Sequence, residues 1–144
     1  MRKILIILII ALTLPSHTYA GTFKSYTDYR CLTAKASKQY CLQQKAYTDN
    51  QGLRRLNGYY MVAIGKGWNI PVGHTCEITL SSGQKVYCVV SDVKQNRHTD
   101  HTNRYDCKGG VLEFIVDTRV LPRQTKRLGD ISCLGFHGSV VKVR

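Results

Sequence analysis

The residues best suited to chemistry lie in a polar loop between two apolar stretches of the chain. The stretches 86–90 and 111–116 are typical of strands, and the loop between them contains Asp92, Asp100, Asp106 and two histidines. Asp92 directly follows the first stretch. A carboxyl group shielded there from water has a raised pKa and can hold a proton near neutral pH. We therefore predict that Asp92 is a catalytic acid and that Asp100, folded back over it by the loop, is its partner.

The sequence His-Thr-Asp-His in this loop has the residue types of a metal site. His98, Asp100 and His101 stand at positions i, i+2 and i+3 of an irregular loop, and this spacing does not define a coordination geometry. We expect no metal and no cofactor. His98 is interpreted as a group that binds substrate or carries a proton, with a solvated loop residue as the alternative.

Two more side chains are candidates for substrate binding. Trp68 follows two glycines in a loop and suits a stacking platform for a sugar or a base, although it suits a lid over the core equally well. Lys94 shares one face with Asp92 under the two-residue period of a strand. An ion pair between them is the alternative to catalysis, because a nearby ammonium group would stabilise the charged carboxylate.

The chain around these residues predicts a mainly β domain with one helix. Residues 34–47 lack Gly and Pro and are rich in helix formers, and Ser37 can cap the main part of this helix. A hairpin turn is expected at 81–83. Strands are expected at 59–64, 76–80, 85–90, 111–116 and 139–143. This number of short strands indicates a small closed β-barrel or a sandwich.

The N-terminus has the pattern of an export signal. Two basic residues, Arg2 and Lys3, precede the apolar run 4–14, and a polar segment ends at Ala20. A bilayer-spanning helix needs about 20 apolar residues, so a membrane anchor is the weaker alternative. We predict that residues 1–20 are a signal peptide cleaved after Ala20 and that the mature protein is exported to the periplasm or the extracellular space.

The charge of the mature chain favours an anionic partner. Loss of Arg2 and Lys3 lowers the formal charge from +12 to +10 on 124 residues, a size suited to one domain. A surface of this charge suits nucleic acid, acidic cell-wall polymers or anionic membrane, and a surface that is simply soluble and cationic is the alternative. A ribonuclease-like site built on Arg97, His98 and Asp100 is the remaining alternative, but no His–Lys–His arrangement on separate strands supports it.

The six cysteines all lie in the predicted mature part. An even number of cysteines in a small exported domain predicts three disulfides. Cys76 and Cys88 flank the expected hairpin turn and could face each other, but the sequence leaves the pairing open. The candidates are Cys31, Cys41, Cys76, Cys88, Cys107 and Cys133.

Taken together, the motifs resemble a known family. The order YYMVAIGKGW, a hairpin, VVSDVK, HTDHTNRY, GGVLEFIVD, LGDIS and FHGSVVKV is similar to the double-psi β-barrel domains of bacterial and phage cell-wall proteins. Their relatives include rare lipoprotein A, three-aspartate domains, membrane-bound lytic transglycosylases, barwins and expansins. The resemblance covers residues 39–143. It implies a six-stranded barrel at 59–144 after a helical lead-in at 21–58. The disulfide links predicted from the cysteine count are a departure, because most bacterial relatives of this kind carry fewer cysteines.

The resemblance also implies a function and a partner, which is peptidoglycan or another anionic cell-wall polymer and not nucleic acid. In the lytic members a carboxylic acid at the end of a barrel strand protonates the glycosidic oxygen of peptidoglycan, and Asp92 stands at the similar position. Asp117, which ends EFIVD, resembles a second recurring aspartate, and Tyr105 ends the HTDHTNRY motif; both are expected to bind substrate. The Asp-x-Gly-Gly signature of lytic members is replaced by Asp92-Val-Lys94. A non-catalytic accessory module of an envelope or phage assembly, with a protein partner, is therefore the alternative.

Overall fold

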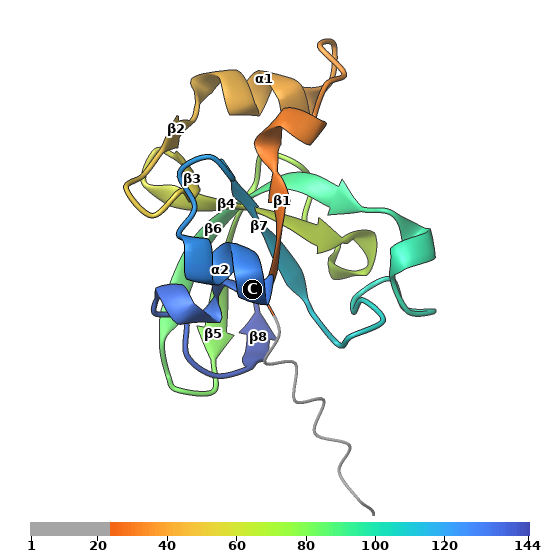
Figure 1. The fold of residues 1–144 in the computed structure, drawn as a ribbon. Coiled ribbons are helices and arrows are strands. Elements are labelled where there is room, and N and C mark those ends of the chain that lie inside the picture. The colour runs from red at the N-terminus through yellow and green to blue at the C-terminus, as the bar shows by residue number, and fades with distance from the viewer. Residues whose placement is uncertain (1–23) are drawn as a thin grey trace, which may run out of the picture.

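The chain folds into a mainly β structure, as predicted (Figure 1). The computed structural model describes residues 24–144, so the predicted signal peptide lies outside the described residues. Within 24–144, no helix has the length and apolar character needed to cross a membrane. The strands are β1 (Ser25–Asp28), β2 (Tyr47–Thr48), β3 (Arg54–Leu56), β4 (Tyr59–Gly65), β5 (Thr75–Leu80), β6 (Lys85–Lys94), β7 (Leu112–Val116) and β8 (Val140–Val143). The helices are α1 (Lys38–Lys45) and α2 (Arg123–Leu128), with 3₁₀ turns η1 (Tyr29–Cys31), η2 (Lys66–Trp68), η3 (Asn96–His98) and η4 (Ile131–Leu134).

One mixed sheet contains all eight of these strands. Its main path runs β1-β7-β4-β6-β5-β8, and β3 joins β2 to the start of β4. Strand β4 is central, because it pairs in parallel with β6 on one side and antiparallel with β7 on the other. The outer strands β1 and β8 are not paired with each other, but the segments next to them meet: the Lys24 ammonium donates to the Gly138 carbonyl at 2.7 Å.

The strands predicted from the sequence correspond to β4 through β8, and β5 and β6 form the predicted hairpin. The predicted count of six strands and one helix differs from the eight strands and two α-helices among the described residues. The lead-in 21–58 contributes β1, β2 and β3 to the sheet. Strand β1 has the polar sequence Ser-Tyr-Thr-Asp and is half-buried throughout. Its parallel pairing with the buried strand β7 stabilises it. Its own sequence lacks the alternation of apolar residues from which a strand can be predicted.

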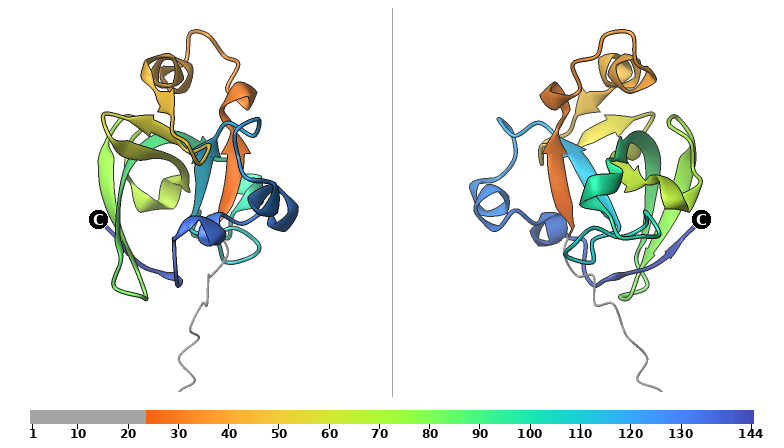
Figure 2. Two further views of the ribbon diagram at one scale, coloured as in Figure 1. Left: turned by 60° about the vertical axis from the view of Figure 1, so that its left-hand side comes forward. Right: turned by 90° about the vertical axis from the view of Figure 1, so that its right-hand side faces the viewer.

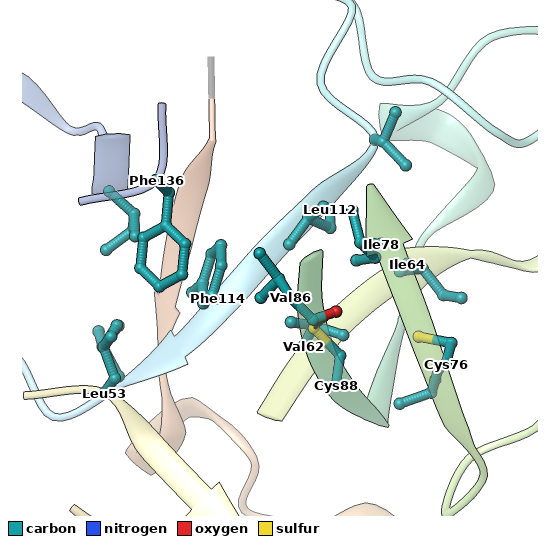
Figure 3. Close-up of a cluster of buried hydrophobic side chains, with 14 of the residues drawn as sticks. Leu53, Val62, Ile64, Cys76, Ile78, Val86, Cys88, Leu112, Phe114 and Phe136 are labelled. Carbon is teal, nitrogen blue, oxygen red and sulfur yellow. Dashed lines mark hydrogen bonds between the residues drawn. The ribbon is translucent and has the colours of Figure 1, made fainter. Parts of the chain in front are cut away.

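The main core lies on one face of the sheet (Figure 3). Phe114 from β7 packs against Phe136 with ring centroids 4.8 Å apart, and Tyr60 contacts both rings edge-on. Aliphatic side chains from β4, β5 and β6 fill the rest: Val62, Ile64, Ile78, Leu80, Val86 and Val90. Because core side chains alternate along these strands, the intervening residues face the other side of the sheet.

Helix α1 covers part of that other face, on the side of the molecule opposite the lower ends of β5 and β8 (Figures 1 and 2). Ser37 caps the helix as predicted, its hydroxyl accepting from the Tyr40 amide at 3.1 Å. The far end is held by the buried Arg54, which donates to the carbonyls of Gln43 and Ala46 at 2.6 and 3.1 Å. The Ala46 amide also donates to the Gln43 carbonyl, at 3.3 Å, so Arg54 reinforces a helix end at which carbonyls have few intrahelical partners. The contact layer beneath α1 consists of Met61, Ala63, Val89 and Ile115.

All six cysteines are free thiols in the structure, so the prediction of three disulfides is not confirmed. Cys76 and Cys88 do face each other in the β5–β6 register, as expected, and both are buried in the core. The other four are exposed and belong to separate segments: Cys31 ends η1, Cys41 lies in α1, Cys107 in the loop before β7 and Cys133 in η4.

Thiol labelling of the native protein tests this arrangement. We expect four thiols to react rapidly with an alkylating reagent, because four are exposed, and two to react only after denaturation. Mass spectrometry of peptides should assign the two slow thiols to Cys76 and Cys88. Rapid labelling of fewer than four thiols in protein purified without reductant would show that the exposed cysteines are paired, as the sequence predicts.

Candidate functional site

An irregularity in strand β6 decides where Asp92 points. Val62 of β4 pairs with Val90, but the next residue, Ala63, pairs with Asp92, so that Ser91 is an extra residue in the ladder. In a regular ladder Asp92 would stand beside Ile64, whose side chain is in the core. The extra residue turns Asp92 to the opposite face, which is a common role of β-bulges next to functional sites.

A second carboxyl group lies on the same face, on the other side of Ala63. Glu113 of β7 pairs with Ala63 from one side and Asp92 of β6 pairs with it from the other. Adjacent strands are 4.7–4.9 Å apart, so the Cα atoms of the two acids are separated by roughly 10 Å. The small side chain of Ala63 leaves the space between them open. Sequence analysis did not identify Glu113, although it is the only charged residue within the apolar stretch 111–116.

The two acids line a cleft of about 380 Å³. Strand β1, turn η1 and turn η3 form its other walls. Of the predicted site residues, the cleft brings together Asp92, Lys94 and His98. The remaining walls include Thr27, Cys31, Leu32 and Ala63. The volume falls in the range of small-ligand sites, about 300–1,000 Å³.

The environment of Asp92 favours the protonated carboxyl group. Burial is the main cause that raises its pKa above the ordinary value of 3.8, and the nearby charge of Glu113 acts in the same direction. Hydrogen bonds from the Val93 amide and the Gln39 side chain oppose this shift without cancelling it. Desolvation and a like charge are the two influences that prepare a carboxyl group to donate a proton near neutral pH.

Lys94 shares the face of Asp92, as predicted, but its ion pairs are with other acids. Its side chain is only 2% exposed, and its ammonium group lies 3.0 Å from the Asp106 carboxylate and 3.6 Å from that of Glu113. The other oxygen of Glu113 accepts from the Thr27 hydroxyl at 2.8 Å. Lys94 therefore fixes the position of Glu113 and does not form an ion pair with Asp92 among the described residues.

Asp100 does not fold back over Asp92 and does not line the cleft. Its carboxylate organises its own loop, accepting from the amides of Arg104 and Tyr105 at 3.0 and 3.2 Å and from the Thr102 hydroxyl. Partial desolvation raises the pKa of Asp100, but these hydrogen bonds outweigh it and the pKa is lowered. A carboxyl group stabilised in its charged form is unsuited to donate a proton.

Trp68 and Tyr105 lie outside the cleft and hold the loop against η2. Their rings meet edge-on with centroids 5.9 Å apart, and the indole nitrogen donates to the Arg104 carbonyl at 3.0 Å. The loop passes so near β4 that a Cβ atom on Gly65 would lie 2.0 Å from the Asn103 carbonyl oxygen. This arrangement matches the alternative in which Trp68 covers the core.

Asp117 also lies away from the cleft, at the end of β7. Its buried carboxylate accepts from the Arg119 guanidinium at 2.7 Å and from the Arg119 amide at 3.0 Å. The hydrogen bonds from the Arg119 side chain lower its pKa. Asp117 thus shapes the turn that leads to α2. Among residues 24–144, no group of three or more His, Cys, Asp or Glu side chains could hold a metal ion.

Replacing Asp92 by Asn tests the burial of this acid through stability. Because the folded-state pKa is raised, the carboxyl group contributes its full stability below its unfolded pKa and loses it as the pH rises through the folded pKa. We expect Asp92→Asn to have a higher Tm than the wild type at neutral pH. The difference should disappear below about pH 3, where both proteins carry an uncharged group.

Asp28→Asn is the matched control, for which we expect the opposite change in Tm at neutral pH. Asp28 accepts from the Arg30 side chain, which is the main cause of its strongly lowered pKa, and from the Thr118 amide and hydroxyl. Its contribution is present above the unfolded pKa and is lost as the pH falls, so this variant should lower the Tm at neutral pH. Equal losses of Tm in both variants would contradict the burial of Asp92.

No protein-family model, curated protein or solved structure matches this chain. The assignment of a function therefore depends on the geometry and chemistry of the cleft itself.

Proposed function

We propose that this protein is an exported cell-wall protein that binds peptidoglycan strands in the Asp92 cleft and cleaves them with Asp92 as the acid. The observation that carries the proposal is the pair of carboxyl groups on either side of Ala63. One of them, Asp92, is desolvated, and the other, Glu113, is held by Lys94 and Thr27. Glycoside cleavage commonly uses two carboxyl groups in different environments.

We further propose that the sheet is a variant of the double-psi β-barrel. Two features support this proposal. The main path of the sheet contains six strands and includes two parallel pairs, β1–β7 and β4–β6. The gap between β1 and β8 is bridged by Lys24, whose carbonyl accepts from the Ile131 amide at 2.8 Å and whose ammonium donates to Gly138. Strands β2 and β3 would then be additions from the lead-in.

The proposed reaction is lytic and needs no water. Asp92 donates its proton to the glycosidic oxygen as the bond from this oxygen to the anomeric carbon breaks. The 6-hydroxyl oxygen of the muramic sugar bonds to that carbon and gives its proton to the Asp92 carboxylate, which restores the acid. Glu113 stabilises the positive charge that develops on the sugar ring. A positioned general acid contributes about 10²–10⁴-fold to such a rate.

Export and an anionic partner are parts of the same proposal. After loss of Arg2 and Lys3 the basic residues fall from 21 to 19 and outnumber the 9 acidic ones, which favours attraction to a polyanionic wall. A non-catalytic glycan-binding module in an envelope or phage assembly could use the same cleft. The two functions differ in whether a glycosidic bond is broken.

Incubation of the purified protein with peptidoglycan separates these functions. We expect soluble anhydro-muropeptides from the wild type, detected by chromatography and mass spectrometry. Asp92→Asn should lower their rate of release by about 100-fold or more, because the amide cannot donate the proton. Glu113→Gln should lower the rate while leaving the product unchanged.

Glu77→Gln is the control for loss of a carboxylate elsewhere. Glu77 lies on β5 and pairs with the exposed Lys85 at 3.1 Å, and this variant should retain the wild-type rate. Binding of peptidoglycan without product would refute the enzyme and leave the binding module, and an equal yield from Asp92→Asn would refute Asp92 as the acid. Products with ordinary reducing ends would indicate that water, activated by Glu113, replaces the sugar hydroxyl.

A further inference from the structure

Helix α1 brings the side chain of Gln39 to the sheet beside the Asp92 cleft. The helix contacts strand β6, and the layer beneath it includes Ala63, which also lines the cleft. Leu42 packs on this layer, and Gln43 is buried. Residues three and four positions apart share one face of a helix, so Gln39 lies on the face that meets the sheet, where it is half-buried.

The Asp92 carboxyl group accepts hydrogen bonds from two neutral groups. One is the backbone amide of Val93, and the other is the side chain of Gln39. Val93 adjoins Asp92 in the chain, so its amide follows the acid in any orientation of strand β6. Gln39 belongs to a different element, and the packing of α1 on the sheet places it here. Its hydrogen bond therefore fixes the carboxyl group relative to the rest of the site.

The lead-in 21–58 supplies a hydrogen-bond donor to each acid of the cleft. Thr27 of β1 donates from its hydroxyl group to Glu113 at 2.8 Å, and Gln39 of α1 donates to Asp92. All the catalytic and substrate-binding residues predicted from the sequence lie within 59–144. The structure adds these two side chains from the preceding segment. Gln39 carries no charge, so it orients Asp92 without the ion pair that would keep an acid ionised.

We propose that Gln39 is a positioning residue for the reaction at Asp92. Its side-chain amide holds the Asp92 carboxyl group toward the cleft before the proton is donated, and it stabilises the carboxylate that remains afterwards. Gln39 does not line the cleft, so it acts through Asp92 and not on the sugar. The catalytic role rests on the proposed function, whereas the hydrogen bond itself is measured without any substrate.

NMR titration of the side-chain carboxyl carbon of Asp92 measures the effect of this hydrogen bond. A donor to the charged carboxylate lowers the pKa, so Gln39→Leu, which removes the donor and keeps an apolar side chain, should raise the pKa of Asp92 above that of the wild type. Gln39→Lys places an ammonium group at the same position and should lower the pKa. A loss of packing alone does not shift the pKa in opposite directions in the two variants.

The pH dependence of anhydro-muropeptide release tests the role in the reaction. Donation requires protonated Asp92, so the rate falls as the pH rises through the pKa of Asp92. In Gln39→Leu this fall should move to higher pH. The rate below it should drop by about tenfold, which corresponds to about 1.4 kcal/mol, because the carboxylate that forms has lost a donor. Gln44→Leu alters an exposed glutamine of the same helix and should keep the wild-type rate and pH profile. Gln39→Asn withdraws the amide by one methylene group and has the same expected result if Gln39→Leu is unstable.

The outcomes distinguish the positioning role from the function. If the pKa of Asp92 is the same in the wild type and in the Gln39 variants, the inference is refuted, even if the protein cleaves peptidoglycan. If the pKa shifts as expected but the wild type releases no product, the proposed function fails and the catalytic role of Gln39 fails with it. A shifted pKa with an unchanged rate and pH profile also refutes the role, while the enzyme stands. A shift of the pKa together with the pH profile supports it.

Discussion

The register shift at Ser91 is the constraint on which the proposed site depends. Strand β6 supplies Val90 to the core and would supply Asp92 to it as well if the ladder were regular. Because side chains along a strand alternate between its two faces, the extra residue moves every later side chain of β6 to the opposite face. It places Asp92 beside Ala63 and Lys94 beside Gly65, on the face that Glu113 also occupies. Strand β6 therefore contributes to the core before Ser91 and to a polar cleft after it.

Lys94 connects this cleft to the loop that follows. Its ammonium group is buried, and a buried charge is tolerated only when oppositely charged groups surround it. Asp106, in the loop that follows β6, and Glu113, on β7, fulfil that requirement. The close approach of the loop to Gly65 and the contact of Trp68 with Tyr105 hold the middle of the same segment. The positions of Glu113 and of the walls near Arg97 and His98 therefore depend on one network of contacts.

The sequence predicted the local elements well and their pairing less well. Apolar runs and turn residues located β4 through β8, the hairpin and the Ser37 cap, because these features depend on neighbouring residues. Strand β1 was not predicted, because the strand that it pairs with lies about 90 residues away in the sequence. Asp92 was identified from its place at the end of an apolar run, whereas Glu113 was not, since its importance arises only when β4 brings β6 and β7 together. Asp100 was chosen by proximity in sequence, but its own loop binds its carboxylate.

The unequal environments of the two acids follow from this arrangement. Glu113 lies within reach of a buried ammonium and a hydroxyl group, while Asp92 is next to neither and receives its hydrogen bonds from neutral amides. The negative charge that Lys94 helps to hold on one side of Ala63 makes a second negative charge on the other side less favourable. The lysine that the sequence suggested as a direct partner of Asp92 thus acts on it indirectly, by fixing Glu113. The ammonium group pairs with Glu113 rather than with Asp92, and the charge of Glu113 adds to burial in raising the pKa of Asp92.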